Sequence, residues 1–191
     1  AGNHDNTLAN ALMYYYGSQN KPFVYRCINR LDRDTTGLTI VAKHALAGGI
    51  LGNAVAKRAI HRTYYAVCSG CTPAYMRISA PIARKDASTI ERCVDFKRGE
   101  NAVTDFIRIK YNPDNNLSLV KLRLLTGRTH QIRVHMKYIG FPLIGDFLYN
   151  PDYTYISRQA LHSGRLVFTH PVTGQKMNLI SDIPSDMKSL F

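Results

Sequence analysis

Charged side chains of both signs crowd the segment between residues 29 and 37. Two carboxylates, Asp32 and Asp34, lie among the guanidinium groups of Arg30 and Arg33. A carboxylate can act as a nucleophile in covalent catalysis, and a neighbouring guanidinium can keep it ionised and fix its direction. Because functional sites are common on loops attached to a rigid scaffold, this segment is the first candidate site. The alternative is a solvated turn whose charges pair with one another.

A second unusual segment spans residues 125–135, where a Thr-Gly turn leads into a predicted helix. Arg128 and Arg133 belong to it, and the positive end of a helix with added arginine suits phosphate binding. His130 and His135 are five positions apart, which is off-phase for two metal ligands on one helical face. We therefore expect no zinc pair here, and a hydrogen-bonded, partly buried role is the default for both histidines.

Four cysteines are present, of which Cys68 and Cys71 form a CxxC pair and Cys27 and Cys93 stand alone. A second CxxC pair, which would complete the common zinc pattern, is missing. We expect reduced thiols, no metal and a cytoplasmic location. A zinc- or thiol-dependent protein built on the CxxC pair is the alternative.

The composition favours a polyanionic partner. The chain has 191 residues, 25 Lys+Arg against 13 Asp+Glu, and a formal net charge of +12. Nucleic acid is the first expectation and an anionic membrane surface the second. The sequence has neither an apolar run long enough to span a membrane nor an opening signal peptide, so we expect no membrane partner. Its length suits one domain.

Three helices are predicted to position these segments: residues 8–16, residues 46–57 and residues 129–139. In the second, Leu46, Ile50 and Ala54 share one face, which we expect to be buried. In the third, Thr129 is the expected N-terminal cap and Gly140 the stop.

The third helix has two expected faces. Ile132, Met136 and Ile139 form its apolar stripe, while Arg133 and its neighbours His130 and Lys137 form a second, basic face.

Strands are predicted at residues 38–42 and 63–68, and hairpins at residues 103–125 and 165–180. In residues 117–125, Val120 and Leu122 alternate with Lys121 and Arg123, so one face of that strand is predicted to be buried and the other basic. Because hairpins outnumber helical connections, we predict an α+β fold: a mixed, largely antiparallel central sheet flanked by helices, with a cleft across it.

Five segments together resemble the RluA-type pseudouridine synthase family, in the family's order and over nearly the whole chain. They are residues 29–38, 62–70, 125–136, 142–146 and 161–174. The resemblance implies that residues 1–191 form one catalytic domain. It also implies that the chain starts downstream of the family's N-terminal strand region and of any S4-like domain.

The resemblance implies a catalytic role for three residues. Asp32 takes the position of the catalytic aspartate, Tyr64 that of the tyrosine stacking on the target base, and Arg133 that of the basic partner of the aspartate. We expect Tyr64 to contact Asp32, and Arg133 to hold both oxygens of Asp32. Asn29 replaces the family's usual histidine, and we expect this to change RNA contacts more than chemistry.

The activity implied is isomerisation of uridine to pseudouridine in structured RNA, with base flipping and without cofactor or metal. Ribosomal RNA is the first expected substrate and transfer RNA the second, and a monomer is the default. A non-catalytic RNA-binding module with the same fold is the alternative. The residues expected to bind RNA are Arg30, Arg62, Arg128, His130 and Lys137.

Overall fold

The computed structural model describes residues 5–87 and 90–191. Residues 3 and 4, at the polar start before the first predicted helix, lie outside the described residues. The chain clusters into two compact units. Unit 1 comprises the chain up to residue 30, residues 39–60 and residues 168–177, and unit 2 comprises residues 31–38, 61–167 and 178–191. Within the described residues, no helix is long and apolar enough to cross a bilayer.

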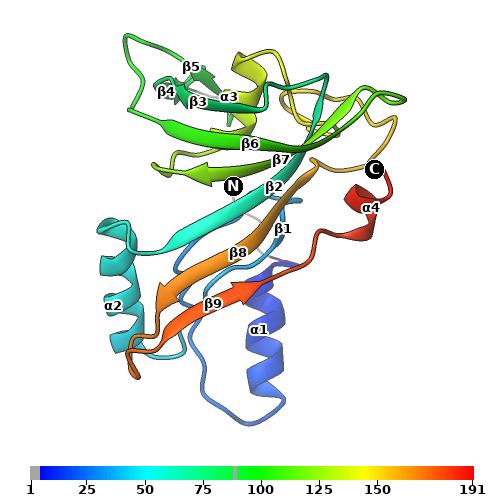
Figure 1. The fold of residues 1–191 in the computed structure, drawn as a ribbon. Coiled ribbons are helices and arrows are strands. Elements are labelled where there is room, and N and C mark those ends of the chain that lie inside the picture. The colour runs from blue at the N-terminus through cyan, green and yellow to red at the C-terminus, as the bar shows by residue number, and fades with distance from the viewer. Residues whose placement is uncertain (1–4, 88–89) are drawn as a thin grey trace. The chain divides into compact units, whose positions relative to one another are not determined.

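The main sheet confirms the predicted α+β class (Figure 1). Its strands are hydrogen-bonded in the order β1-β8-β2-β7-β6-β3, with β9 on the other side of β8. β1 pairs with β8 in parallel, whereas the pairings of β2, β3, β6 and β7 are antiparallel. The strands are β1 (Thr36–Gly37), β2 (His61–Ser69), β3 (Tyr75–Ser79), β6 (Val103–Asn112), β7 (Leu117–Leu124), β8 (Leu161–Thr169) and β9 (Lys176–Ile180). β4 (Ile82–Arg84) and β5 (Arg92–Val94) form a separate small sheet.

Alternation along the strands gives the sheet two different faces. On one face, Tyr64, Phe106 and Leu122 pack with Ile132 and Met136 of helix α3 (Gln131–Tyr138) into a buried cluster. We call this side the α3 face. The predicted alternation in β7 is confirmed, because Leu122 is fully buried while its neighbours in the strand are exposed.

The opposite face is only partly covered. Helix α4 (Ser185–Lys188) places Met187 against Val67 and Leu117, and the chain end packs beside them. The remaining side chains on that side project from five neighbouring strands, and we call them the open face. They are Arg165, Thr63, Lys121, Arg123, Asp105, Ile107, Arg77 and Tyr75.

Unit 1 contains helices α1 (Leu8–Gly17) and α2 (Ala45–Ala56), close to the predicted bounds. Thr7 caps α1 with a capping box in which Asn10 returns the hydrogen bond.

The predicted buried face of α2 is wrong. Its buried residues are Ala47 and Leu51, whereas Leu46 is 73% exposed. The side chain of Arg26 packs closely against Gly48. The side of α2 that carries Gly48 therefore packs against the rest of unit 1, because glycine has no side chain there.

The predicted strand at residues 38–42 is also wrong as a regular element. Only Thr36 and Gly37 join the sheet, and Val41 forms an isolated bridge with Cys27. Gly37 has a φ of +103°, which an extended strand does not adopt, and it lies directly against the backbone of Ser163. The apolar pattern correctly indicated burial, since Ile40 and Ala42 are buried. The chain changes direction before these residues can form a series of hydrogen bonds with a neighbouring strand.

Candidate active site

Arg133, in the first turn of α3, is the centre of a buried charge cluster in unit 2. Its Nε and Nη2 atoms each donate to the carboxylate of Asp146 at 2.7 Å, and its Nη1 donates to Oδ2 of Asp32 at 3.2 Å. The side chains of Arg133 and Asp146 are 1% and 0% exposed, whereas that of Asp32 is 29% exposed. The arginine therefore links a buried carboxylate to one that solvent, and a substrate, can reach.

This geometry confirms that Arg133 pairs with Asp32 and corrects the expected form of the pair. The two-pronged contact goes to Asp146, and Asp32 receives one hydrogen bond. The predicted basic face of α3 is wrong for Arg133, because that side chain is buried between the rings of Phe147 and Tyr149. Burial opposes the charge of Arg133, but Asp146 and Asp32 outweigh it, so its pKa is raised.

The start of α3 also differs from the prediction. The cap residue is His130, with a φ of +56°, and it makes no side-chain capping bond. Gln131 holds this turn instead, since its Oε1 accepts from the backbone of Arg128 and from the hydroxyl of Thr126. The expected stop at Gly140 is confirmed by its φ of +84° just beyond the helix.

Buried polar groups hold the loop that carries Asp32 through hydrogen bonds. Thr35 N donates to the carbonyl of Asp32, closing a tight turn in which Asp34 has a φ of +69°. The amide of Gln159, itself buried, donates to the carbonyl of Arg33 and to the hydroxyl of Thr35. The backbone of Asp32 and of the residues that follow it is thus anchored, which limits the directions its carboxylate can take.

His130 lies beside the same carboxylate. Its Nε2 is 4.0 Å from Oδ2 of Asp32, and its Nδ1 is 2.9 Å from the hydroxyl of Tyr149. Burial lowers the pKa of His130, with the charge of Asp32 acting against this shift. The Tyr149 hydroxyl accepts from Arg92 N, so its own proton is free for Nδ1 of a neutral His130. That assignment leaves the imidazole proton on Nε2, the nitrogen nearer Asp32.

Tyr64 projects from β2 on the α3 face and is 5% exposed. Burial raises its pKa, while the nearby Arg62 lowers it and the charge of Asp32 raises it further. Asp32 thus acts on Tyr64 electrostatically, and the expected contact between the two side chains stays a prediction. A phenol whose pKa is raised is a poor base at neutral pH, which favours a packing role for Tyr64 over proton removal.

The residues predicted to bind RNA fall into different environments. Arg62 lies near Tyr64 and reaches Gly127, and Lys137 lies over the ring of Tyr149 at 5.6 Å. Arg128 is engaged by Glu100 and by the carbonyl of Asn101. Arg30 is exposed and belongs to unit 1.

A polar hollow of about 510 Å³ borders the turn before α3. Arg92 connects it to the charge cluster, because its backbone N–H donates to Tyr149, the partner of His130. Among the described residues, the side chains of Arg84 and Arg92 donate hydrogen bonds to backbone carbonyls, which do not neutralise their charges. The lining residues are Ile82, Ala83, Arg84, Arg92, Arg98, Glu100, Gly127, Arg128 and Thr129.

Sequence reasoning missed Asp146, Gln159 and Tyr149 as members of this site. Asp146 could have been found, because it ends the motif at residues 142–146 and follows Gly145, whose φ is +68°. A Cβ on Gly145 would overlap the carbonyl of Arg158, so only glycine fits before Asp146. Gln159 gives no such signal, since a buried glutamine that holds a loop has no characteristic spacing.

Asn29 does not face solvent as an RNA contact would. It is 7% exposed, and its Oδ1 accepts from the backbone N–H of Ile40 at 2.9 Å. The expectation that it changes RNA contacts is therefore wrong, because its side chain joins two backbone segments of unit 1.

The CxxC pair is divided between two environments. Cys68 is fully buried in β2, where burial raises the pKa of its thiol, whereas Cys71 is exposed and accepts from Arg108. No cluster that could hold a metal ion occurs among residues 5–87 and 90–191.

Comparison with known proteins agrees with this site. The family described as RNA pseudouridylate synthase matches residues 2–138, which include Asp32, Tyr64 and Arg133. The chain belongs to this RNA pseudouridylate synthase family. The match confirms the resemblance to RluA-type pseudouridine synthases stated from the motifs.

Relatives with curated descriptions match over almost all of this family member. It is 43% identical over 97% of its length to a protein of Bacillus subtilis strain 168 described as an uncharacterized RNA pseudouridine synthase, YjbO. It is 38% identical over its whole length to the ribosomal large subunit pseudouridine synthase D of Zymomonas mobilis. The chain spans 65% and 64% of the length of these two relatives.

A solved structure shows the same architecture. The human RNA pseudouridylate synthase domain containing 1 superposes with a TM-score of 0.80 at 26% identity, covering 94% of this chain and 75% of that one.

Proposed function

We propose that this chain isomerises uridine to pseudouridine in RNA, with Asp32 as the nucleophile. The observation that carries the proposal is the unequal sharing of Arg133 between two carboxylates. Asp146 takes two of its nitrogens in a fully buried pair, and this fixes the guanidinium that faces Asp32. Asp32 is thus a carboxylate oriented by a buried guanidinium at the edge of a buried network, as covalent catalysis requires.

The reaction breaks the bond between N1 of uracil and C1′ of ribose, turns the base, and joins C5 to C1′. The proton on C5 leaves at the end and one is returned to N1, so no co-reactant is consumed. Oδ2 of Asp32 accepts from Arg133, which leaves Oδ1 as the oxygen for attack on the sugar or the base. Of the groups beside it, neutral His130 carries on Nε2 a proton that it can donate, whereas Tyr64, whose pKa is raised, is a poor proton acceptor.

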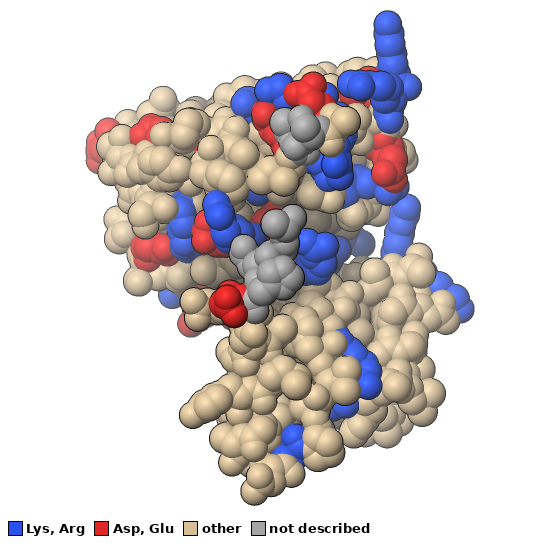
Figure 2. Space-filling view, turned by 180° about the vertical axis from the view of Figure 1, so that it is seen from behind, with Lys and Arg blue, Asp and Glu red and all other residues tan. Residues whose placement is uncertain are grey.

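A target uridine stacked in RNA has to be flipped out to reach Asp32, at a cost of a few kcal/mol. The arginine-lined hollow beside α3 supports this step, because it can hold the phosphates on either side of the flipped nucleotide. Figure 2 shows Lys and Arg side chains gathered on the face of the molecule seen from behind.

We propose ribosomal RNA as the substrate. The support is the printed description of the Zymomonas mobilis relative and of other relatives in Haemophilus and Vibrio, all named for the large ribosomal subunit. Transfer RNA is the alternative, and mapping pseudouridine in total RNA with and without the gene distinguishes the two.

The decisive experiment replaces Asp32 by Asn and measures pseudouridine by mass spectrometry of the treated RNA. We expect turnover to fall below detection while RNA affinity stays within a few-fold, because the size of the side chain is kept and its charge is lost. Asp34→Asn is the matched control, since that side chain is exposed and its ion pair among the described residues is with Arg33. Turnover by the Asp32 variant, or its loss in the Asp34 variant, would move the nucleophile.

A further inference from the structure

The open face of the sheet carries a row of charged side chains opposite to the side packed on α3. Arg165 of β8 is the cross-strand neighbour of Thr63, and Thr63 is in turn the neighbour of Arg123 in β7. The row continues through Asp105 to Arg77. Because neighbouring strands lie about 4.8 Å apart, the three arginines are spaced about 10 Å from one another across the sheet.

Most of this positive charge has no carboxylate partner. Asp105 is held by Arg77 through two hydrogen bonds of 2.6 and 2.7 Å, and Arg77 is the only arginine of the row paired in this way among the described residues. Arg165 donates to the amide oxygen of Asn178, a neutral group. For Lys121, no ion pair is formed with any described residue.

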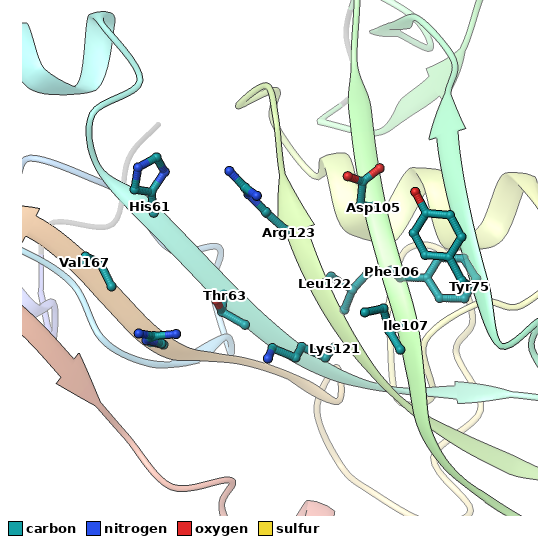
Figure 3. A pocket seen from close by; sticks show the side chains of 11 residues that line it. His61, Thr63, Tyr75, Asp105, Phe106, Ile107, Lys121, Leu122, Arg123 and Val167 are labelled. Atoms are coloured by element: carbon teal, nitrogen blue, oxygen red, sulfur yellow. The ribbon is translucent and has the colours of Figure 1, made fainter.

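Beside the row, the same face presents apolar and aromatic surface. Tyr75 is 57% exposed and Ile107, its cross-strand neighbour, is 51% exposed. Lys121 pairs with Ile107 on the other side, so an ammonium group, an aliphatic side chain and an aromatic ring follow one another across three strands. Together with Arg123 and Arg165 they line a hollow of about 490 Å³, shown in Figure 3.

We propose that the open face binds a single-stranded segment of RNA, independently of the Asp32 site. The phosphates lie along Arg165, Arg123 and Lys121, and a base stacks on Tyr75. A sheet that displays exposed aromatic rings among basic side chains is a known means of holding unpaired nucleotides without a metal or a deep pocket. The unneutralised charge of the face argues for a polyanion, and the exposed ring argues for bases rather than for phosphate alone.

This inference goes beyond the proposed isomerisation, because the face lies on the side of the sheet away from α3. Tyr64, Leu122 and Phe106 point to α3, while their neighbours in the same strands point to the open face. An RNA strand on the open face therefore cannot place its base at Asp32. It would add affinity for a flanking segment of the substrate and leave the chemistry to the other face.

The test uses a fluorescent decamer of cytidine, which has no uridine to isomerise and no stable secondary structure. Its affinity is measured by anisotropy over a range of salt concentrations, for the intact chain and for a variant with three charges removed. The variant is Lys121→Gln, Arg123→Gln and Arg165→Gln. We expect at least tenfold weaker binding, and a slope of log affinity against log salt that is smaller by about 2 for three lost contacts.

A control variant with the same change in net charge removes three exposed lysines that lie off the open face. It is Lys21→Gln, Lys97→Gln and Lys188→Gln. We expect binding within twofold of the intact chain. Tyr75→Ala alone should weaken binding about tenfold without changing the salt slope, because it removes stacking and no charge. Thermal unfolding by circular dichroism checks that each variant is folded.

Three outcomes would overturn the inference. One is equal binding by the open-face variant and the lysine control. Another is loss of decamer binding when Arg84 and Arg92 are changed to Gln, which would place the RNA in the hollow beside α3. The third is equal competition by polyglutamate of matched charge, which would make the face a general anion surface. Asp32→Asn should leave decamer binding unchanged, so failure here is distinct from failure of the proposed isomerisation.

Discussion

Arginine side chains lie on both faces of the sheet, but they are buried and paired on one face and exposed on the other. Arg133, which packs on the α3 side, is buried, held between two aromatic rings, and bonded to Asp146 and Asp32. Arg123 and Arg165, on the open face, are exposed and lack such a carboxylate clamp. A buried and fully bonded cation can fix the direction of a nucleophile, whereas an exposed cation is free to follow a flexible polyanion. We therefore expect the same substitution of an arginine to have a larger effect on stability and turnover on the α3 side than on the open face.

The largest difference is expected for removal of the arginine itself. Arg133→Met leaves the carboxylate of Asp146 buried without its partner, so we expect a loss of about 3–5 kcal/mol in the free energy of unfolding, together with loss of turnover. Arg123→Met on the open face should change stability by less than about 0.5 kcal/mol. Urea unfolding of the two variants measures the difference. Similar values for both would show that the buried pair does not differ energetically from a surface arginine.

Asp146→Asn tests whether the second carboxylate positions Arg133. The amide keeps the size of the side chain but can accept with only one oxygen, so the guanidinium loses part of its clamp. We expect turnover to fall about 100-fold while RNA affinity is kept, because the nucleophile is displaced and the RNA contacts are not. A fall in affinity with unchanged turnover at saturating RNA would contradict a positioning role.

Three histidines whose pKa is lowered by burial should make stability depend on pH. Burial lowers the pKa of His130, His135 and His162 from 6.5. The unfolded chain then binds more protons than the folded one below pH 6.5, so stability is lost as the pH falls from 6.5 through the folded pKa values. We expect the free energy of unfolding, measured in urea between pH 7.5 and 5, to fall more gradually in His135→Gln. His61→Gln, on an exposed side chain, is the control, and an equal effect of both would refute the assignment.

The smallest effect is expected for Tyr149→Phe, which removes one hydroxyl from the buried network. His130 loses its hydrogen-bond donor and Arg92 N loses its acceptor. We expect a loss of about 1–2 kcal/mol in stability and a reduction in turnover of several-fold, because His130 is then free to change tautomer. Turnover as high as in the intact chain would show that the orientation of His130 does not matter for the reaction.

The sequence predicted the elements whose pattern is regular and missed those fixed by contacts between distant segments. The alternation in β7 is a local signal, and it was predicted correctly. The burial of Arg133 was not, because a periodic pattern assigns charged residues to the solvent side unless a buried partner is known. That partner, Asp146, is 13 residues further along the chain.

The residues of the candidate site were predicted from their motifs, whereas the contacts that hold the loop of Asp32 were not. Asp32 and Arg133 were paired correctly, yet the single hydrogen bond between them follows from the loop that Gln159 anchors. A loop held through buried backbone carbonyls leaves no pattern in the amino-acid sequence. The strand predicted at residues 38–42 was wrong for a similar reason. The backbone of Gly37 lies directly against that of Ser163, which is far away in the sequence.

The alternation of the strands has a consequence for how such a sheet can change over generations. Up to the register shift in β6 between Arg108 and Lys110, the open-face residues of β2, β3, β6 and β7 have odd numbers and the residues packed toward α3 have even ones. Substitutions at the exposed positions Lys121 and Arg123 thus leave unchanged the side chains of β7 that pack toward α3. A deletion of one residue within β7 would do the reverse, exchanging Arg123 and Leu122 between solvent and core. If the open face holds RNA as proposed, point substitutions there change which RNA is held, whereas a change in strand length disturbs both faces at once.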